Sequence, residues 1–399
     1  MIHMLQHFFI AKKQFFSIIL VGVIFAAVAT TAMTPAHAQT EAAPSVQAPG
    51  AIPDLPADEY YRAVVLSLKH ADAQLVPGET ERLTTYTLKI GSGKENGNIV
   101  TSEVNETDQT LANRAFGVGD RVIVVKSYQF NGGPKYYLAD NDRLRPLVLI
   151  ALFFLLVAVV FGKMRGFSSV FGLATTIAII LYYVVPHIAS GESPLRVSVM
   201  AAAAIATLSL YLAHGFNQRT TIALSGTVLT FALSTWFAIR SVSWSHLFGT
   251  GSEDAVFLQG MGSGAIDLHG LLLAGIMLGV LGILDDITTA QSAIVDELHR
   301  ANPALRFREL YQRGLSVGRE HIASLMNTLF LAYAGASLPL FLLFALNKGQ
   351  PIWFIVNSET ISEEIVRTLV GSVCLIFAVP ITTLLAAAWY SRQKNGTHP

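Results

Sequence analysis

The sequence predicts an α-helical membrane bundle of about seven transmembrane helices with a small extracytoplasmic β domain, barrel-like or sandwich-like, at its amino-terminal side. Of the 399 residues, 52% are hydrophobic and 14% are charged, whereas an ordinary soluble domain has roughly 25% charged residues. Apolar runs long enough to cross the hydrocarbon core of a bilayer recur through the second part of the chain. Between Tyr60 and Asp140 the apolar residues instead alternate with period two, which is typical of strands.

Charge and cysteine content exclude several classes of protein. Lys+Arg and Asp+Glu are 27 each, so the composition indicates no nucleic-acid partner, which would require a basic patch or stripe. The single cysteine, Cys374, lies in an apolar run. No disulfide can therefore form within one chain, and a thiolate zinc site is excluded.

Residues 1–38 are predicted to be a secretory signal peptide. Lys12 and Lys13 precede an apolar run at 15–29, and Ala36 and Ala38 are small residues at the positions that a signal peptidase reads. The alternative is an uncleaved anchor helix, and either interpretation exports the residues that follow. Residues 39–56, rich in Ala, Pro and Gln, are interpreted as a flexible linker.

The extracytoplasmic β domain is assigned to residues 57–143. The predicted strands are 62–68, 83–90, 99–104, 121–128 and 136–139. A hairpin turn is predicted between the last two, where Asn131 and Gly132 tolerate positive φ. No cluster of His, Asp and Glu with ligand spacing occurs in this segment, so we expect a structural or protein-contacting module.

The transmembrane domain is assigned to residues 146–391, with a cytoplasmic tail at 392–399. The predicted spans are 146–161, 167–185, 195–213, 221–239, 268–284, 322–346 and 365–390. With the β domain outside, the inward connections carry most of the basic residues, above all an Arg-rich cytoplasmic segment at 285–320. The positive-inside rule and the signal segment thus predict the same topology, that of a multi-pass protein of a bacterial cytoplasmic (inner) membrane. The lipid bilayer is the one partner that this topology requires.

The fifth span ends in two acids, and ionisable groups inside spans are expensive and often functional. Gly275, Gly279, Gly282 and Asp286 are spaced four, three and four apart, which places them on one helix face. A face of small residues allows a second helix to approach closely. The face that leads to Asp286 is therefore a candidate for an ion or proton site or for helix packing, and Asp285 is its electrostatic neighbour.

Polar residues around the acid pair complete the candidate site. Thr289 follows Asp285 by one helical turn, and Asn327 lies within the sixth span, where an amide needs a partner. Carboxylate and hydroxyl oxygens together could hold a hard cation or exchange a proton. The alternative is that the acids are solvated or paired with the Arg-rich segment, and that Asn327 only joins helices. No His-x-x-x-His pair occurs, so a helical zinc site is not expected.

Long motifs in both parts of the chain resemble the YibE/F family of bacterial membrane proteins. They comprise residues 118–122, 136–140, Arg143, 270–286 and 327–339. The resemblance covers the chain from about Tyr60 to the final span. It implies an exported β domain fused to a polytopic bundle, and transport is the role often presumed for that family.

Three functional hypotheses follow. The first is a secondary transporter or ion-coupled permease, not an enzyme, in which Asp286 binds a coupling cation or proton and Asn327 faces it; no internal repeat supports it. The second is an envelope scaffold, receptor or assembly factor whose β domain binds another envelope protein. The third is a magnesium-dependent membrane enzyme, because residues 282–286 resemble the Asp-Asp segment of polyprenyl-phosphate sugar-phosphate transferases. Their Asn-x-x-Asp-Gly segment is missing here, and the sequence gives no indication of oligomeric state.

Overall fold

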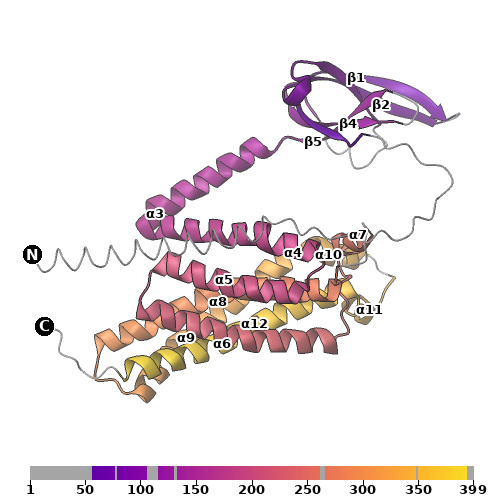
Figure 1. Cartoon of the computed structure of the whole chain (residues 1–399). Helices are drawn as coiled ribbons and strands as arrows, with labels where there is room; N and C mark the ends of the chain where they lie inside the picture. Colours follow the sequence, from indigo (N-terminus) through magenta and orange to yellow (C-terminus); the bar gives the residue numbers. More distant parts are fainter. Residues whose placement is uncertain are drawn as a thin grey trace, which may run out of the picture. The chain divides into compact units, whose positions relative to one another are not determined.

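The computed structural model describes residues 56–76, 79–105, 116–129, 133–260, 266–346 and 349–392. The chain forms two compact units, one ending at Leu156 and one containing the helices from Val157 onward (Figure 1). The predicted signal segment 1–38 lies outside the described residues. So do residues 39–55 of the predicted linker and Asn131 and Gly132 of the predicted hairpin turn.

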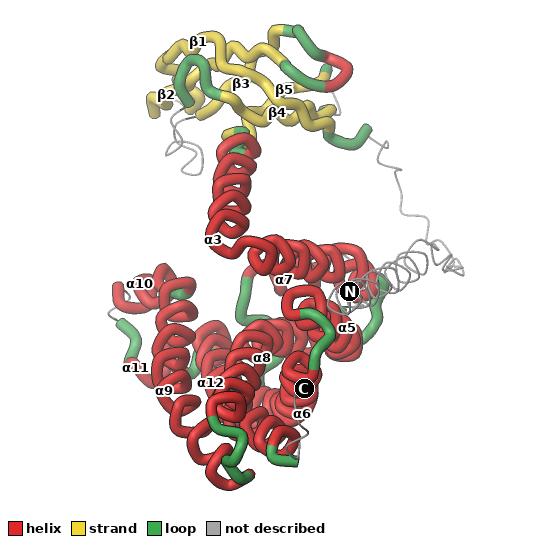
Figure 2. Tube along the Cα trace, turned by 90° about the vertical axis from the view of Figure 1, so that its left-hand side faces the viewer, coloured by secondary structure: helices red, strands yellow, loops and turns green. Residues whose placement is uncertain are grey.

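The first unit contains a five-stranded antiparallel sheet, and all five predicted strands are present (Figure 2). They are β1 Glu59–Val76, β2 Glu79–Ile90, β3 Ile99–Asn105, β4 Arg121–Tyr128 and β5 Pro134–Asn141, with a short 3-10 helix η1 Gly93–Glu95 between β2 and β3. The order across the sheet is β3-β2-β1-β4-β5. The prediction of a small barrel or sandwich is confirmed in the form of a partly closed barrel.

The two outer strands of this sheet curl toward each other. The Leu138 N–H of β5 donates a hydrogen bond to Ser102 Oγ of β3 over 2.9 Å. A register shift between Val65 and Ser67 in β1 allows the strand to bend, because bulges increase local twist. The neighbouring order β4-β1-β2-β3 is that of a Greek key, and the contact of β3 with β5 makes the sheet a partly closed barrel.

The second unit is helical. Its elements follow α3 Leu144–Ile179, which begins in the first unit: η2 Ile180–Val184, α4 Val185–Ala189, α5 Pro194–His214, α6 Gln218–Trp244, α7 Glu253–Gly260, α8 Leu268–Ala301, α9 Phe307–Ala336, α10 Leu338–Leu346, α11 Ile352–Val356 and α12 Glu359–Tyr390. Lys163, with φ of 51°, interrupts α3. This break separates the first predicted span from the second.

Six helical segments in the described part of the chain are long and apolar enough to cross a membrane. A seventh is formed if α9 and α10, which meet at an angle of 60°, make one bent span. The bend lies beside Pro339, whose ring cannot continue a regular helix hydrogen-bond pattern. The prediction of about seven spans is therefore confirmed as six to seven.

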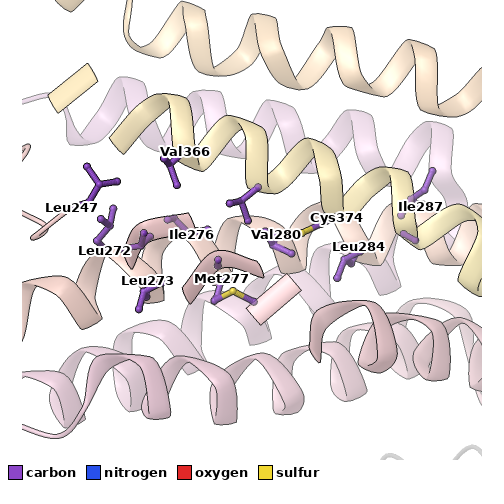
Figure 3. Close-up of a cluster of buried hydrophobic side chains, with 14 of the residues drawn as sticks. Leu247, Leu272, Leu273, Ile276, Met277, Val280, Leu284, Ile287, Val366 and Cys374 are labelled. Atoms are coloured by element: carbon purple, nitrogen blue, oxygen red, sulfur yellow. The ribbon is translucent and has the colours of Figure 1, made fainter. Parts of the chain in front are cut away.

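Helices α6, α8 and α12 pack together at the centre of the helical unit. Their shared core includes Val242, Met277, Leu284, Val370 and Ala378, all of which are fully buried. Figure 3 shows this cluster, with Met277 and Leu284 of α8 pointing into the same region as Cys374 of α12. Up to Ile287, α8 is apolar on the side that packs on α6 and α12, and this central helix carries both aspartates.

Candidate functional site

Asp285 is the predicted site residue with the most unusual surroundings. The Ser209 Oγ of α5 donates a hydrogen bond to its Oδ2 over 3.0 Å. The other carboxylate oxygen, Oδ1, is buried and has no hydrogen-bond partner among the described residues. Buried polar atoms in native proteins are almost always paired, so an unpaired carboxylate oxygen requires an explanation.

Asp286 lies beside Asp285 in a different environment. Asp286 is exposed and Asp285 is half-buried. His214, the last residue of α5, is close enough to Asp286 for an electrostatic interaction. The glycine spacing had singled out Asp286, but the more enclosed carboxylate is Asp285.

A cavity of about 350 Å³ lies one helical turn from Asp285. Thr289 lines this cavity, and its Oγ1 donates to the Asp285 carbonyl oxygen over 2.7 Å. The remaining polar residues of its lining are Ser168, His214, Asn217, Arg219 and Thr220. Helices α3, α5, α6 and α8 thus all contribute to one polar cavity.

Local structure at the start of α6 shapes one side of this cavity. Gly215 has φ of 77°, a conformation that glycine adopts without a Cβ clash, and it turns the chain between α5 and α6. Asn217 then caps α6, with its Oδ1 accepting the Thr220 N–H over 2.9 Å. Arg219, half-buried in the first turn, makes no ion pair among the described residues.

The predicted glycine face of α8 is largely open. A Cβ built on Gly275 or Gly282 would meet no atom within 4 Å, whereas one on Gly279 would lie 3.2 Å from Tyr333 Oη of α9. Asn327 of α9 is exposed, and among the described residues no hydrogen bond joins it to either aspartate. Asp285, Asp286 and Thr289 thus lie within about one turn of α8, and the Thr289 hydroxyl bonds the Asp285 backbone, whereas the predicted contact of Asn327 with the aspartates is not among the hydrogen bonds of the described residues.

A buried polar layer continues from the aspartates along α8, in residues that the sequence offers as possible ligands beside Asp285 but that join helices in the structure. Thr288 Oγ1 lies 2.8 Å from Thr227 Oγ1 of α6. Gln291 Nε2 donates to the Gly314 carbonyl oxygen over 2.8 Å and to Thr383 Oγ1 over 2.7 Å. One amide thus joins α8 to α9 and α12, and a glutamine followed by serine between apolar residues is the signal that could have revealed it.

Two other acids, in the first turns of α12, bind a loop. Glu359 accepts the Phe248 N–H over 2.7 Å and the Thr250 hydroxyl over 2.6 Å. Glu363 accepts the Gly251 N–H over 3.0 Å. These carboxylates are occupied by the backbone of the α6–α7 connection, so their role is to hold that loop.

The described residues contain no group of three or more His, Cys, Asp and Glu side chains placed to hold a metal ion. The carboxylates nearest in sequence to Thr289 of the cavity are a pair, Asp285 and Asp286, and neither belongs to the cavity lining itself. A pair with one unpartnered oxygen can exchange a proton or contribute ligands to a cation that keeps other oxygen ligands.

Comparison with known proteins identifies the helical part of the chain. The family model described as YibE/F-like protein matches residues 149–392. No curated protein and no solved structure matches the chain.

Proposed function

The chain belongs to the YibE/F-like family and is an integral membrane protein, and on that premise we propose that it is a secondary transporter or ion-coupled permease. Asp285 is its principal ion-binding group, Asp286 is the electrostatic neighbour, and a proton or cation is the coupling species. The matched segment contains the acid pair, the cavity and all but the beginning of the first candidate span.

The observation that carries the proposal is the unpartnered Oδ1 of Asp285. A carboxylate oxygen removed from water and left without a donor is costly. This free-energy cost is lowered when the oxygen binds a proton, a cation or a water molecule. Ser209 holds the other oxygen, so the carboxylate is oriented while one acceptor stays available.

The adjacent cavity supports the proposal because it offers a solute a polar site next to the carboxylate. Arg219 brings a positive charge to the lining, and Thr289 lies one helical turn from Asp285. Under the positive-inside rule this end of the bundle faces the cytoplasm. The proposed location is a bacterial inner membrane, with the β domain outside and the carboxyl terminus inside.

Ion and proton flux into sealed liposomes tests the proposal. Wild-type protein is compared with Asp285→Asn and Asp286→Asn, which keep side-chain shape and remove charge. Asp254→Asn in α7 is the matched control, because Asp254 is exposed and distant in sequence from the cavity. We expect Asp285→Asn to lower flux at least about tenfold, the effect of losing ~1.4 kcal/mol or more of binding, and the control to keep it. Unchanged flux and pH dependence in Asp285→Asn would reject the ion site.

The β domain favours a second candidate, an envelope scaffold or receptor. The registers place Tyr60, Val125 and Tyr137 in one row across β1, β4 and β5, and Tyr60 and Tyr137 remain 71% and 42% exposed. Exposed tyrosines are enriched in protein interfaces. A photo-crosslinker placed at position 60 tests this candidate, and one placed at exposed Thr101 of β3 is the control. Capture of one envelope protein at position 60 and of none at position 101, together with the absence of flux in every liposome assay, would favour the scaffold or receptor.

A further inference from the structure

The junction between β5 and α3 fixes one end of the β domain near the membrane surface. β5 ends at Asn141 and α3 begins at Leu144, and three residues of extended chain reach at most ~10 Å. The Asp142 N–H donates to the Arg121 carbonyl oxygen over 2.8 Å. The Leu144 N–H donates to Asp142 Oδ1 over 3.2 Å, so the connection is held against the start of β4.

Two exposed apolar side chains lie at this end of the domain. Val118, 64% exposed, is at the tip of the turn before β4, and Leu66, 42% exposed, is at the bulge of β1. The turn and the bulge are hydrogen-bonded to each other, with the Gly119 N–H donating to the Val65 carbonyl oxygen over 2.8 Å. Val118 and Leu66 therefore belong to one small surface beside the junction.

The same end carries four arginines, Arg62, Arg121, Arg143 and Arg145, two of which have an acidic partner. Arg143 pairs with Asp140, and Arg62 lies 3.7 Å from Asp142. Exposed Arg121 and Arg145 make no ion pair among the described residues. Arg145 is the second residue of a strongly apolar candidate span, a position from which a long side chain extends to the headgroup layer.

From this arrangement we infer that the Val118–Leu66 end of the β domain docks on the lipid surface into which α3 inserts. Val118 and Leu66 contact the interfacial region, and Arg121 and Arg145 bind lipid phosphates. Apolar side chains and basic groups together are what an anionic bilayer surface binds. The inference is independent of the proposed transport function.

Fluorescence quenching in nanodiscs tests the docking surface. Single cysteines at Val118 and at Lys135 are introduced into full-length Cys374→Ala protein, since Cys374 is the only native thiol and is buried. Lys135, exposed near the start of β5, lies six strand residues from Asn141, about 20 Å away. A fluorophore at position 118 should lose most of its emission to a headgroup nitroxide lipid, and one at 135 should lose little.

Charge reversal provides the second measurement. In nanodiscs rich in phosphatidylglycerol, Arg121→Glu should weaken quenching at position 118, and raising the salt concentration should do the same. Lys135→Glu is the charge-matched control and should have no effect. Equal quenching at positions 118 and 135 would overturn the inference, as would a position-118 signal that neither lipid charge nor Arg121→Glu changes.

Discussion

The two faces of α8 differ in how they use small and polar residues. On the face toward α6, α9 and α12, Thr288 and Gln291 are fully buried, and a Cβ on Gly318 of α9 would lie 2.9 Å from Gln291 Oε1. The helices around α8 also approach one another closely: a Cβ on Gly226 of α6 would lie 2.5 Å from Thr382 Oγ1 of α12, and one on Gly318 would lie 2.4 Å from Val379 Cγ1 of α12. On the other face, Gly275 and Gly282 border open space.

This difference shows that a glycine spacing indicates possible contact and not actual contact. Gly226 and Gly318 stand where a second helix leaves no room for a side chain. Gly318 follows Gly314 at a spacing of four, whereas Gly226 has no glycine at that spacing. Helix packing at Gly275 and Gly282 stays a prediction, because it would require a helix from another chain to lie against this face. Three tests can break or sharpen this comparison, in order of expected effect, and a fourth concerns a paired carboxylate of the β domain.

The largest effect is expected for Gly226→Ala compared with Gly275→Ala. The new methyl group at position 226 meets buried, β-branched Thr382, and such overpacking costs about 1–3 kcal/mol. Alanine at position 275 meets nothing and is the better helix former by up to ~1 kcal/mol. The apparent melting temperature of purified protein in detergent should fall for the first and hold or rise for the second. Equal shifts would contradict the distinction between an enclosed glycine and an open one.

Next is the comparison of two amides, Gln291→Leu and Asn327→Leu. Leucine at position 291 removes two hydrogen bonds and leaves the Gly314 carbonyl oxygen without that donor, a loss of about 1–3 kcal/mol. Asn327 is exposed on a helix within a candidate span, so leucine there should be tolerated. Thermal unfolding of both variants measures the difference, and an equally destabilised Asn327→Leu would place that amide in a structural role.

Asp285→Asn should separate stability from function. The wild-type carboxylate already has one buried oxygen without a partner, so removing its charge removes a cost and should leave the melting temperature unchanged or slightly higher. Ser209 can still donate to the amide oxygen. A clear loss of thermal stability would show that Asp285 is held for structural reasons, whatever the flux assay shows.

The smallest effect concerns a carboxylate that is fully paired. Glu95 in the β domain lies 2.5 Å from Lys126 Nζ and accepts the Tyr136 hydroxyl over 2.7 Å, and these contacts lower the pKa of Glu95. Because the folded pKa is below the unfolded one, its stabilisation is complete above the unfolded value, ~4.3, and is lost as pH falls through the folded value. Acidification from neutral pH should therefore weaken the barrel.

Pepsin cleavage of full-length protein between pH 5 and 2 measures this dependence. In Glu95→Gln the part of the acid sensitivity due to this carboxylate should disappear, and cleavage within 121–141 should become less dependent on pH. Exposed Glu103 of β3 supplies the control, Glu103→Gln, against which rates are compared at each pH. Identical profiles for the two variants would rule out a stabilising Glu95–Lys126 pair.

The amino-acid sequence by itself determined the kind of structure in each region. Period-two alternation marked all five strands, and β4 has the bounds that were predicted for it. Apolar length marked the spans, because burial in lipid requires a continuous apolar run. The predicted ends of an element were wrong where strand pairing or helix packing extends the element beyond its sequence pattern. β1 extends to Val76 by pairing with β2, and α8 continues past its apolar run to Ala301.

Only the tertiary structure decided the use of the candidate residues. Asp285 and Asp286 were recognisable in sequence as two costly acids, but the contact with Ser209, 76 positions away, depends on which helix packs beside α8 and how each is rotated. The same holds for the cavity at Thr289 and for the close approach of Gly226 to Thr382. Local periodicity specifies which residues share a face, whereas the partner of that face follows from long-range packing between helices.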